Sequence, residues 1–374
     1  MPTRPTLLIL SFSPIHADAR VLRQVQLLSG SYDVTTCGYG PAPEGVVDHI
    51  EIPAEHVYWR KDQRLLLQRR YAAVYRSNEV VRYLWDRLPR GYFDVVLADD
   101  IDTVPLALSL GARAGVHVDL HEYAPRQNEE MWRWRLLVAP YLRWLCRTYL
   151  PLASSVTTVG AGLAAEYGRE FGVDAAVVVN APHYADLTPG EVGDPIRLVH
   201  SGNARRGRRL EIMLDAVAAS RRPFTLDLYL MPNDPVYLAE LRERAETMPE
   251  VTVHDPVPPT ELARTLSAYD VGVYVLPPVS FNNLWALPNK FFDFIQGRLG
   301  LIVGPSPEMA GIVRRHGLGE VTEGFTAEAL TAVLDELDPA QVRRWKQASH
   351  EVAAEYSAEQ QTQGWADAVA AILR

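Results

Sequence analysis

Short apolar runs alternate along the chain with stretches in which apolar side chains recur at helical spacing. Such runs are typical of parallel strands whose two faces are both covered by helices. The order of strand, loop and helix is that of a doubly wound α/β sheet, and it occurs in two series. Residues 180–194 separate the two series and are rich in Pro and Gly. Strands are expected at residues 6–11, 32–36, 46–52, 94–98, 116–119, 155–159, 176–179, 196–201, 225–230, 251–254, 271–276 and 301–303.

The same pattern divides the chain into three parts. Residues 1–187 and 195–350 are each expected to form one α/β domain, which suits a chain of 374 residues. Residues 351–374 end in a helix that carries Trp365 and Val369 on one face. We expect this apolar face to pack back on the first domain.

The composition excludes some classes of protein. A hydrophobic content of 48% and a charged content of 22% are ordinary for a soluble globular enzyme, and a net charge of -9 argues against a nucleic-acid-binding protein. Cys37 and Cys146 have neither metal-ligand spacing nor the pattern of a disulfide framework. The apolar run at residues 7–10 is too short for a signal peptide, and none approaches the roughly 18 residues of a membrane span. We therefore expect a cytoplasmic protein.

Residues 284–304 are the most informative stretch and predict a loop, a helix and a buried strand. Pro288 suits the first turn of the helix, because its missing N–H would have no partner there. Asn289, Lys290 and Asp293 lie around the helix start, where unpaired backbone N–H groups and the helix dipole favour a phosphate. The Asp293 carboxylate can accept two hydrogen bonds from a diol such as a ribose. Alternatively, Lys290 and Asp293 form an ordinary surface ion pair, worth a few tenths of a kcal/mol.

A second candidate site for phosphate follows the strand at residues 196–201. The turn at residues 202–209 contains two glycines and five basic or amide side chains before the next helix begins. Gly202 lets the backbone approach a ligand, and Arg205 and Arg208 offer bidentate donors. The alternative is an exposed basic loop.

Polar residues also follow the strands of the first domain. In doubly wound sheets, ligands bind beyond the carboxyl ends of the strands, which is where His16, Asp18 and Arg20 are expected. Asp18 can instead cap the following helix, a contribution of about 1 kcal/mol. His121 and Glu122 follow the fifth strand, where a histidine and a carboxylate suit acid–base or hydrogen-bonding work on a sugar or phosphate. A satisfied polar pair in a loop is the alternative.

The acidic segment at residues 99–103 follows the fourth strand and has two interpretations. Its Asp-x-Asp triplet, which begins at Asp100, can bind a divalent metal through hard oxygen ligands. It also resembles a strand end that leads into a helix, with Pro105 in the first helical turn. Short acidic triplets are weak signals, so the second interpretation is favoured.

Two helical segments combine basic and aromatic side chains. Residues 56–90 contain nine Arg or Lys residues against three acidic ones, and residues 131–147 add Trp132, Trp134 and Trp144. Basic helices with aromatics at the apolar edge can lie on an anionic membrane surface. Each segment alone is explained by a solvated basic face over core aromatics, but the pair together favours contact with a membrane.

Taken together, these motifs resemble those of the retaining glycosyltransferases of family 4. The similarity covers nearly the full chain, and it implies the GT-B architecture, in which two Rossmann-like domains face each other across a cleft. The first domain would be the acceptor side and the second would bind the nucleotide sugar. The motifs that carry the resemblance are DARV at 18–21, DVVLADDIDT at 94–103, DLHE at 119–122, LPNKFFD at 287–293 and LIVG at 301–304.

The resemblance implies roles for individual residues. Asp293 stands where the family has the second Glu of a Glu-x(7)-Glu pattern, and it would bind the ribose hydroxyls. The first Glu of the pattern is replaced by Trp285, so Asn282 and Asn283 would supply hydrogen bonds instead. The implied catalytic residues are His121, Arg208 and Lys290; the donor-binding residues are Gly202, Asn203, Arg205, Asn282, Asn283, Asn289 and Asp293; the acceptor-side residues are His16, Asp18, Asp100 and Glu122.

The implied reaction is transfer of a sugar from a nucleoside diphosphate sugar to an acceptor hydroxyl, with retention at the anomeric carbon. No metal and no cofactor is expected beyond this donor substrate. The implied acceptor is a glycan, a lipid-linked molecule or a small molecule, in cell-surface glycan or glycolipid synthesis. The expected location is the cytoplasm, including the inner face of an anionic membrane, and no nucleic-acid partner is expected.

Two other functions remain open on the sequence. One is a sugar-nucleotide epimerase of the same fold, which would require more carboxylates around the sugar than this sequence offers. The other is a non-catalytic partner subunit that has kept the fold, and Trp285 at the usual Glu position is the feature that favours it.

Overall fold

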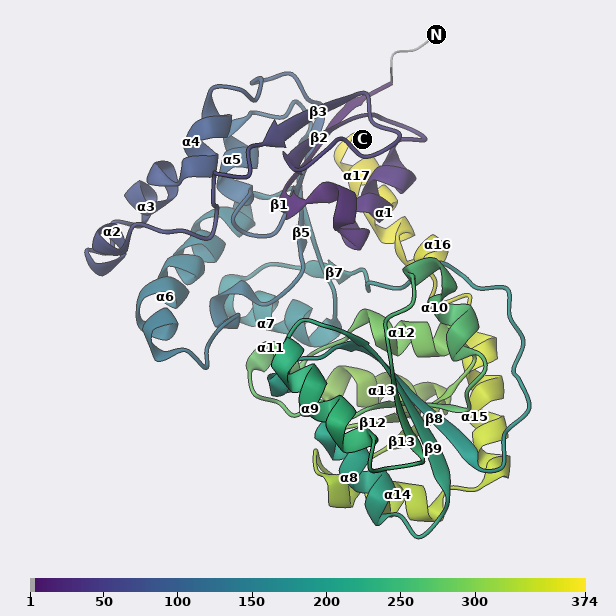
Figure 1. The fold of residues 1–374 in the computed structure, drawn as a ribbon. Coiled ribbons are helices and arrows are strands. Elements are labelled where there is room, and N and C mark those ends of the chain that lie inside the picture. The colour runs from purple at the N-terminus through teal and green to yellow at the C-terminus, as the bar shows by residue number, and fades with distance from the viewer. Residues whose placement is uncertain (1–3) are drawn as a thin grey trace. The chain divides into compact units, whose positions relative to one another are not determined.

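A computed structural model describes residues 4–374 of the chain. They form two compact units, each built around one sheet of parallel strands (Figure 1). The first unit comprises residues 4–179, 280–282 and 362–374, and the second comprises residues 180–279 and 283–361.

The first unit contains a seven-stranded sheet in the order β3-β2-β1-β4-β5-β6-β7. The order reverses between β1 and β4, and this switch point leaves a crevice at the carboxyl ends of the strands. Strands β1 and β4 form the centre of the core because their apolar runs are buried on both faces. The strands are β1 Thr6–Pro14, β2 Asp33–Tyr39, β3 Asp48–Ile52, β4 Val95–Asp99, β5 Gly115–Leu120, β6 Ser155–Thr158 and β7 Ala175–Val177.

Helices surround this sheet. The C-terminal helix α17 packs against α1, β5 and β6, and it buries Trp365 and Val369. The basic segment at residues 56–90 forms three short helices, because Arg69 turns the chain with a positive φ and the Asn78 side chain caps a new helix. The helices of the first unit are α1 Ala19–Leu28, α2 Gln63–Leu67, α3 Tyr71–Ser77, α4 Glu79–Trp85, α5 Val104–Ser109, α6 Trp132–Tyr149, α7 Ala161–Phe171 and α17 Gln363–Ile372.

The second unit contains a six-stranded sheet in the order β10-β9-β8-β11-β12-β13, with its switch point between β8 and β11. Strand β13 was not predicted, because its three residues form no apolar run. The strands are β8 Ile196–Asn203, β9 Phe224–Met231, β10 Val251–His254, β11 Val271–Tyr274, β12 Gly300–Val303 and β13 Gly319–Val321.

Helix α12 of the second unit buries Phe291, Phe294 and Ile295, as the predicted apolar stripe requires. Pro288 stands immediately before the helix rather than inside it. The helices are α8 Glu211–Ala219, α9 Pro235–Ala245, α10 Pro259–Leu266, α12 Asn289–Gln296, α13 Pro307–His316, α14 Ala327–Glu336, α15 Pro339–Val352 and α16 Ala358–Gln361, and α11 Phe281–Leu284 crosses the division between the units.

The prediction of two doubly wound α/β sheets is therefore confirmed. Cys37 and Cys146 are unbridged and buried. None of the helices in residues 4–374 is both long enough and apolar enough to cross a membrane.

Candidate functional site

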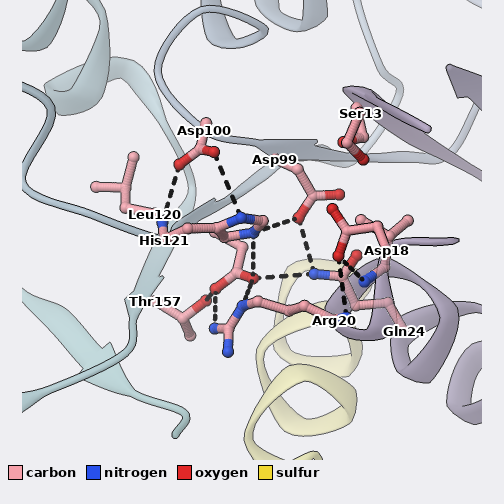
Figure 2. A network of polar contacts seen from close by, with 12 residues as sticks. Ser13, Asp18, Arg20, Gln24, Asp99, Asp100, Leu120, His121 and Thr157 are labelled. Carbon is pink, nitrogen blue, oxygen red and sulfur yellow. Dashed lines mark hydrogen bonds and ion pairs between the residues drawn. The ribbon is translucent and has the colours of Figure 1, made fainter. Parts of the chain in front are cut away.

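The first unit holds a cluster of charged side chains at the carboxyl ends of its central strands (Figure 2). Asp99 at the end of β4 lies opposite Asp119 on β5 in the strand register. Arg20 on α1 donates to both oxygens of Asp119 at 2.7 Å. Gln24, one helical turn further on, donates to Asp99 Oδ1 at 2.8 Å and to Asp119 Oδ2 at 2.9 Å. Helix α1 therefore fixes two buried carboxylates from neighbouring strands.

His121 completes this cluster just beyond β5. Its Nε2 lies 3.4 Å from Asp99 Oδ1 and 3.5 Å from Asp119 Oδ2, and its Nδ1 lies 3.4 Å from Asp100 Oδ2. Burial alone would lower the pKa of His121, but the carboxylates of Asp100, Asp119 and Asp99 hold it well above its ordinary value. His121 is thus an imidazolium at neutral pH, which donates hydrogen bonds and is unsuited to act as a base or nucleophile.

The two buried aspartates differ in their affinity for a proton. Burial opposes the charge of Asp119, but Arg20 and His121 hold the pKa of this carboxyl well below its usual range. Burial raises the pKa of Asp99 to about 6, although His121 and Gln24 oppose the shift. Asp99 Oδ2 has no hydrogen-bond partner among residues 4–374. Asp99 is therefore the carboxylate of the cluster that still requires a donor.

The geometry of this cluster shows how well it could bind a divalent metal. Asp99, Asp119 and His121 offer ligand atoms within 4.8 Å of one another. However, Arg20 occupies both oxygens of Asp119, and His121 is positively charged, so a divalent cation would meet two cations at these positions. The donor set therefore fits a metal poorly.

The two carboxylates of the Asp-x-Asp triplet already have partners in the protein. Asp102 forms an ion pair with Lys61 at 2.8 Å. Asp100 adopts a φ of +63°, a left-handed conformation that Asp tolerates, and its Oδ1 accepts the His121 backbone N–H at 2.9 Å. Pro105 lies in the first turn of α5, as the second interpretation predicted.

A cavity of about 400 Å³ opens beside this cluster in the first unit. Asp18, Asp100, His121 and Glu122 line it, whereas His16 is not among the described residues that do so. Asp18 also caps α1, because its Oδ1 accepts the N–H groups of Arg20 at 3.0 Å and Val21 at 3.3 Å. The capping interpretation of Asp18 is thus correct, and the residue faces the cavity as well. The exposed His16 ring instead covers Gly40.

The second unit holds a separate basic cluster at its own switch point. His200 on β8 donates from Nδ1 to the Val273 carbonyl at 2.8 Å, so its Nε2 is left to accept a hydrogen bond. Lys290 Nζ lies 3.3 Å from this nitrogen and 4.7 Å from the centre of the Tyr274 ring. Arg208 Nη1 donates to the Tyr274 hydroxyl at 2.5 Å. Two cationic side chains are thereby held around one tyrosine.

Gly202 makes this arrangement possible. Its φ of +141° is rarely adopted by other residues, and a Cβ at this position would collide with Lys290 Nζ. Burial and the nearby Arg208 guanidinium lower the pKa of Lys290 to about 7, while Asp293 opposes the shift. A buried lysine that gives up its proton this readily requires an anionic partner to stay charged.

Most of the other predicted donor-binding residues belong to the second unit, and one belongs to the first. Asn203 ends β8, Arg205 is exposed, and Asn289 and Asp293 lie on α12 with Lys290. Asn282 belongs to the first unit, where its Oδ1 accepts the Tyr123 backbone N–H at 3.0 Å. The side-chain amide of Asn282 therefore binds the backbone at Tyr123. Asn283, the next residue, belongs to the second unit.

Several residues of the two clusters had no predicted role. Asp99 and Asp119 belong to the motifs at residues 94–103 and 119–122, but no role was predicted for either side chain. Gln24 fits the pattern of a helix, and nothing in the sequence marks it as a site residue. His200 lies within strand β8, and Tyr274 ends the apolar strand β11. A histidine within a strand that is buried on both faces is a usable signal, because it must find partners there.

Two doubly wound parallel sheets, each with charged side chains at its switch point, define the GT-B fold class. Solved structures with this fold align over almost the entire chain. HepE of Anabaena in complex with UDP and glucose is 13% identical, covers 98% of this chain and 100% of its own, and gives a TM-score of 0.68. Sucrose-phosphate synthase of Thermosynechococcus elongatus is 13% identical, with the same coverage and a TM-score of 0.67. α,α-Trehalose 6-phosphate synthase of Burkholderia multivorans is 11% identical, covers 99% of both chains and gives a TM-score of 0.68.

No protein-family model and no curated protein sequence matches the chain. At identities this low, the structural similarity establishes the fold alone.

Proposed function

We propose that the chain is a glycosyltransferase that moves a sugar from a nucleoside diphosphate sugar to an acceptor hydroxyl. The observation that carries this proposal is the pairing of Lys290 with Arg208 around Tyr274, beside Gly202 and the start of α12. Two cations, a helix N-terminus and an open backbone are the parts that bind a diphosphate. The structures of similar fold contain UDP with glucose, and UDP-glucose, which agrees with this assignment.

In this proposal, the second unit stabilises the leaving diphosphate. Negative charge develops on the diphosphate as its bond to the sugar breaks, and Arg208, Lys290 and the α12 N-terminus stabilise this charge. One such preorganised hydrogen-bond donor contributes about 3 kcal/mol. His121 acts as a hydrogen-bond donor that orients a sugar, since it holds its proton at neutral pH. The resemblance to family 4 implies retention. Since no group of the charged clusters among residues 4–374 is placed as a covalent nucleophile, we infer that retention proceeds by a same-face transfer.

Metal independence belongs to the same proposal. The basic cluster supplies positive charge to the diphosphate without an ion, and Arg20 opposes a cation in the acidic cluster. The hexosyltransferase type and a role in cell-surface glycan synthesis rest on the motifs alone.

Nucleotide binding provides the first test. A thermal-shift panel of UDP, GDP, ADP, CMP and dTDP, each with and without Mg²⁺, should single out one diphosphate that needs no metal. A ligand at 100 times its dissociation constant stabilises by about 2.7 kcal/mol, which such an assay detects easily. The Asp293→Ala variant should fold normally and lose most of the shift, because Asp293 would bind the ribose. An unchanged shift in this variant would remove Asp293 from the site.

The panel, followed by an assay of sugar-nucleotide turnover with and without an acceptor, separates the two alternative functions from the transferase. A non-catalytic partner subunit, favoured by Trp285, predicts weak nucleotide binding and no turnover. An epimerase predicts that the sugar nucleotide changes when no acceptor is present. A transferase requires an acceptor for any change beyond slow hydrolysis.

Peripheral contact with an anionic membrane is the second part of the proposal. A groove of about 990 Å³ over α2, α3 and α6 is lined by four arginines and by Tyr71 and Trp144. Helix α2 packs against α6, and Leu67 and Leu136 on these helices are 67% and 65% exposed. Arginines beside exposed apolar side chains suit an interface of anionic lipid headgroups. The arginines of the groove are Arg69, Arg70, Arg76 and Arg82.

Sedimentation with liposomes tests this part. The full chain should sediment with vesicles that contain anionic lipid, and sedimentation should fall when salt is raised. Replacing Arg69, Arg70 and Arg76 by Glu should abolish it. Sedimentation of the triple variant to the same extent would exclude this surface, and no sedimentation of the unaltered chain would exclude contact with an anionic membrane.

A further inference from the structure

The cavity in the first unit carries an excess of negative charge. Five carboxylate side chains and two cationic ones line it. Lys61 is paired with Asp102, and His121 is already shared among several carboxylates. The cavity therefore keeps acceptors of hydrogen bonds in excess over cationic donors. Its carboxylates are Asp18, Asp99, Asp100, Asp102 and Glu122.

One carboxylate oxygen in the cavity wall lacks a donor altogether. Asp99 is only 2% exposed, and its Oδ2 contacts no donor within the described part of the chain. A buried carboxylate oxygen without a partner is costly, and native structures rarely tolerate it without a ligand or an ion. Asp99 lines the cavity together with Asp18 and Ser13, and Figure 2 shows these three on the same side of the network. The missing donor is therefore expected from the cavity side.

Aromatic side chains form another part of the wall. Phe12 lies 5.7 Å from Tyr58, and Tyr58 lies 5.3 Å from Trp59, measured between ring centres. Aromatic faces pack against sugar rings and attract nearby cations. A volume of about 400 Å³ falls near the lower end of small-molecule pockets, which suits a ligand of one or two rings.

We propose that this cavity binds an acceptor sugar that carries a protonated amine, with the ammonium donating to Asp99 Oδ2 and facing Asp18. The assignment rests on the proposed transferase function, for which it names the acceptor class. An ammonium supplies both the charge and the hydrogen-bond donors that the cavity lacks, whereas a neutral sugar supplies only donors. A phosphorylated sugar would meet carboxylates of its own sign.

The preference of the cavity for an amino sugar can be measured in the absence of a nucleotide sugar. Titrations of the full chain at about pH 7 would compare glucosamine with glucose, N-acetylglucosamine and glucose 6-phosphate by ligand-observed NMR. Glucosamine should bind at least about tenfold more tightly than either neutral sugar, the factor expected of one charge-assisted hydrogen bond. Its affinity alone should fall as salt is raised, and glucose 6-phosphate should bind weakest.

Two isosteric variants identify the groups responsible. Asp18→Asn removes the charge and keeps the helix cap, because Asn caps as well as Asp. Asp99→Asn removes the charge and keeps an acceptor for Gln24. Each should reduce the preference for glucosamine over glucose several-fold while the melting curve confirms folding. Glu51→Gln, an exposed charge change on β3, is the matched control and should leave the preference unchanged.

The outcomes separate this inference from the proposed function. Equal binding of glucosamine and glucose, or a preference that both variants retain, would overturn the amine site. Nucleotide binding in the second unit, measured in the same samples, would then still support the transferase. A glucosamine preference without any nucleotide binding would support the amine site and refute the transferase.

Discussion

Raising the pH from about 7 to about 8.5 should weaken nucleotide binding to the second unit about fifteenfold. The reason is Lys290, whose pKa burial and Arg208 lower to about 7. A bound phosphate favours the charged form, so the lysine takes up a proton on binding. Half of the lysine carries its proton at about pH 7 and only about 3% at about pH 8.5, which gives the factor, equivalent to roughly 1.6 kcal/mol.

The sign of this effect follows from the direction of the pKa shift. Because the pKa of Lys290 is lowered in the unoccupied site and raised by the ligand, affinity is full below about pH 7 and falls roughly tenfold per unit above it. A terminal phosphate has its last pKa near 6, so ionisation of the nucleotide adds little change in this range. The pH dependence above neutrality therefore reports the lysine.

Calorimetry gives the direct measurement. Titrations of the diphosphate in two buffers of different ionisation enthalpy should show uptake of nearly one proton per nucleotide at about pH 8.5. Lys290→Arg keeps a charge that never titrates in this range, so its affinity should be nearly constant with pH. Lys290→Met should bind about 10- to 100-fold more weakly at pH 7, because a charge-assisted hydrogen bond is lost. A wild-type affinity that does not change with pH, or no proton uptake, would refute the reasoning.

Three further predictions concern single contacts. Gly202→Ala should weaken nucleotide binding and lower stability by about 1–3 kcal/mol, because the new Cβ meets both a strained φ and Lys290; a nucleotide titration and a melting curve measure the two effects. Arg20→Met should destabilise the protein by about 3–5 kcal/mol in chemical denaturation, since it removes the guanidinium that donates to both oxygens of the buried Asp119 carboxylate. Arg169→Met breaks an exposed ion pair and should destabilise the protein far less than Arg20→Met in the same assay; an equal loss of stability in both variants would contradict the burial argument.

Much of the fold could be predicted from the sequence because its strands are apolar runs bounded by turn residues. Strand β13 escaped prediction since Gly319–Val321 pairs with β12 through the backbone and has no pattern of its own. The pattern of residues 56–90 predicts a helical segment, but the breaks at Arg69 and Asn78 depend on local conformation and capping.

The residues of the candidate sites also divide into those that the sequence could place and those that it could not. Residues that directly follow a strand, such as His121 and Asp100, could be placed because the carboxyl ends of parallel strands share one edge. Arg20 and Gln24 act across the unit from a helix, and which carboxylates they meet depends on how α1 packs. The Asn282 side chain was expected at the donor, but Tyr123 binds it through contacts between segments far apart in the chain.

The Arg20 guanidinium has a consequence for how the protein is made. It donates to the Val178 carbonyl at 3.0 Å and lies 4.6 Å from the centre of the Trp365 ring on α17. The first unit is thus completed by a helix that is synthesised only after residues 180–279 and 283–361, which form the second unit. A chain that stopped just before α17 would therefore lack part of the core of the first unit. Until α17 has been synthesised, the newly made first unit exposes apolar surface that can aggregate.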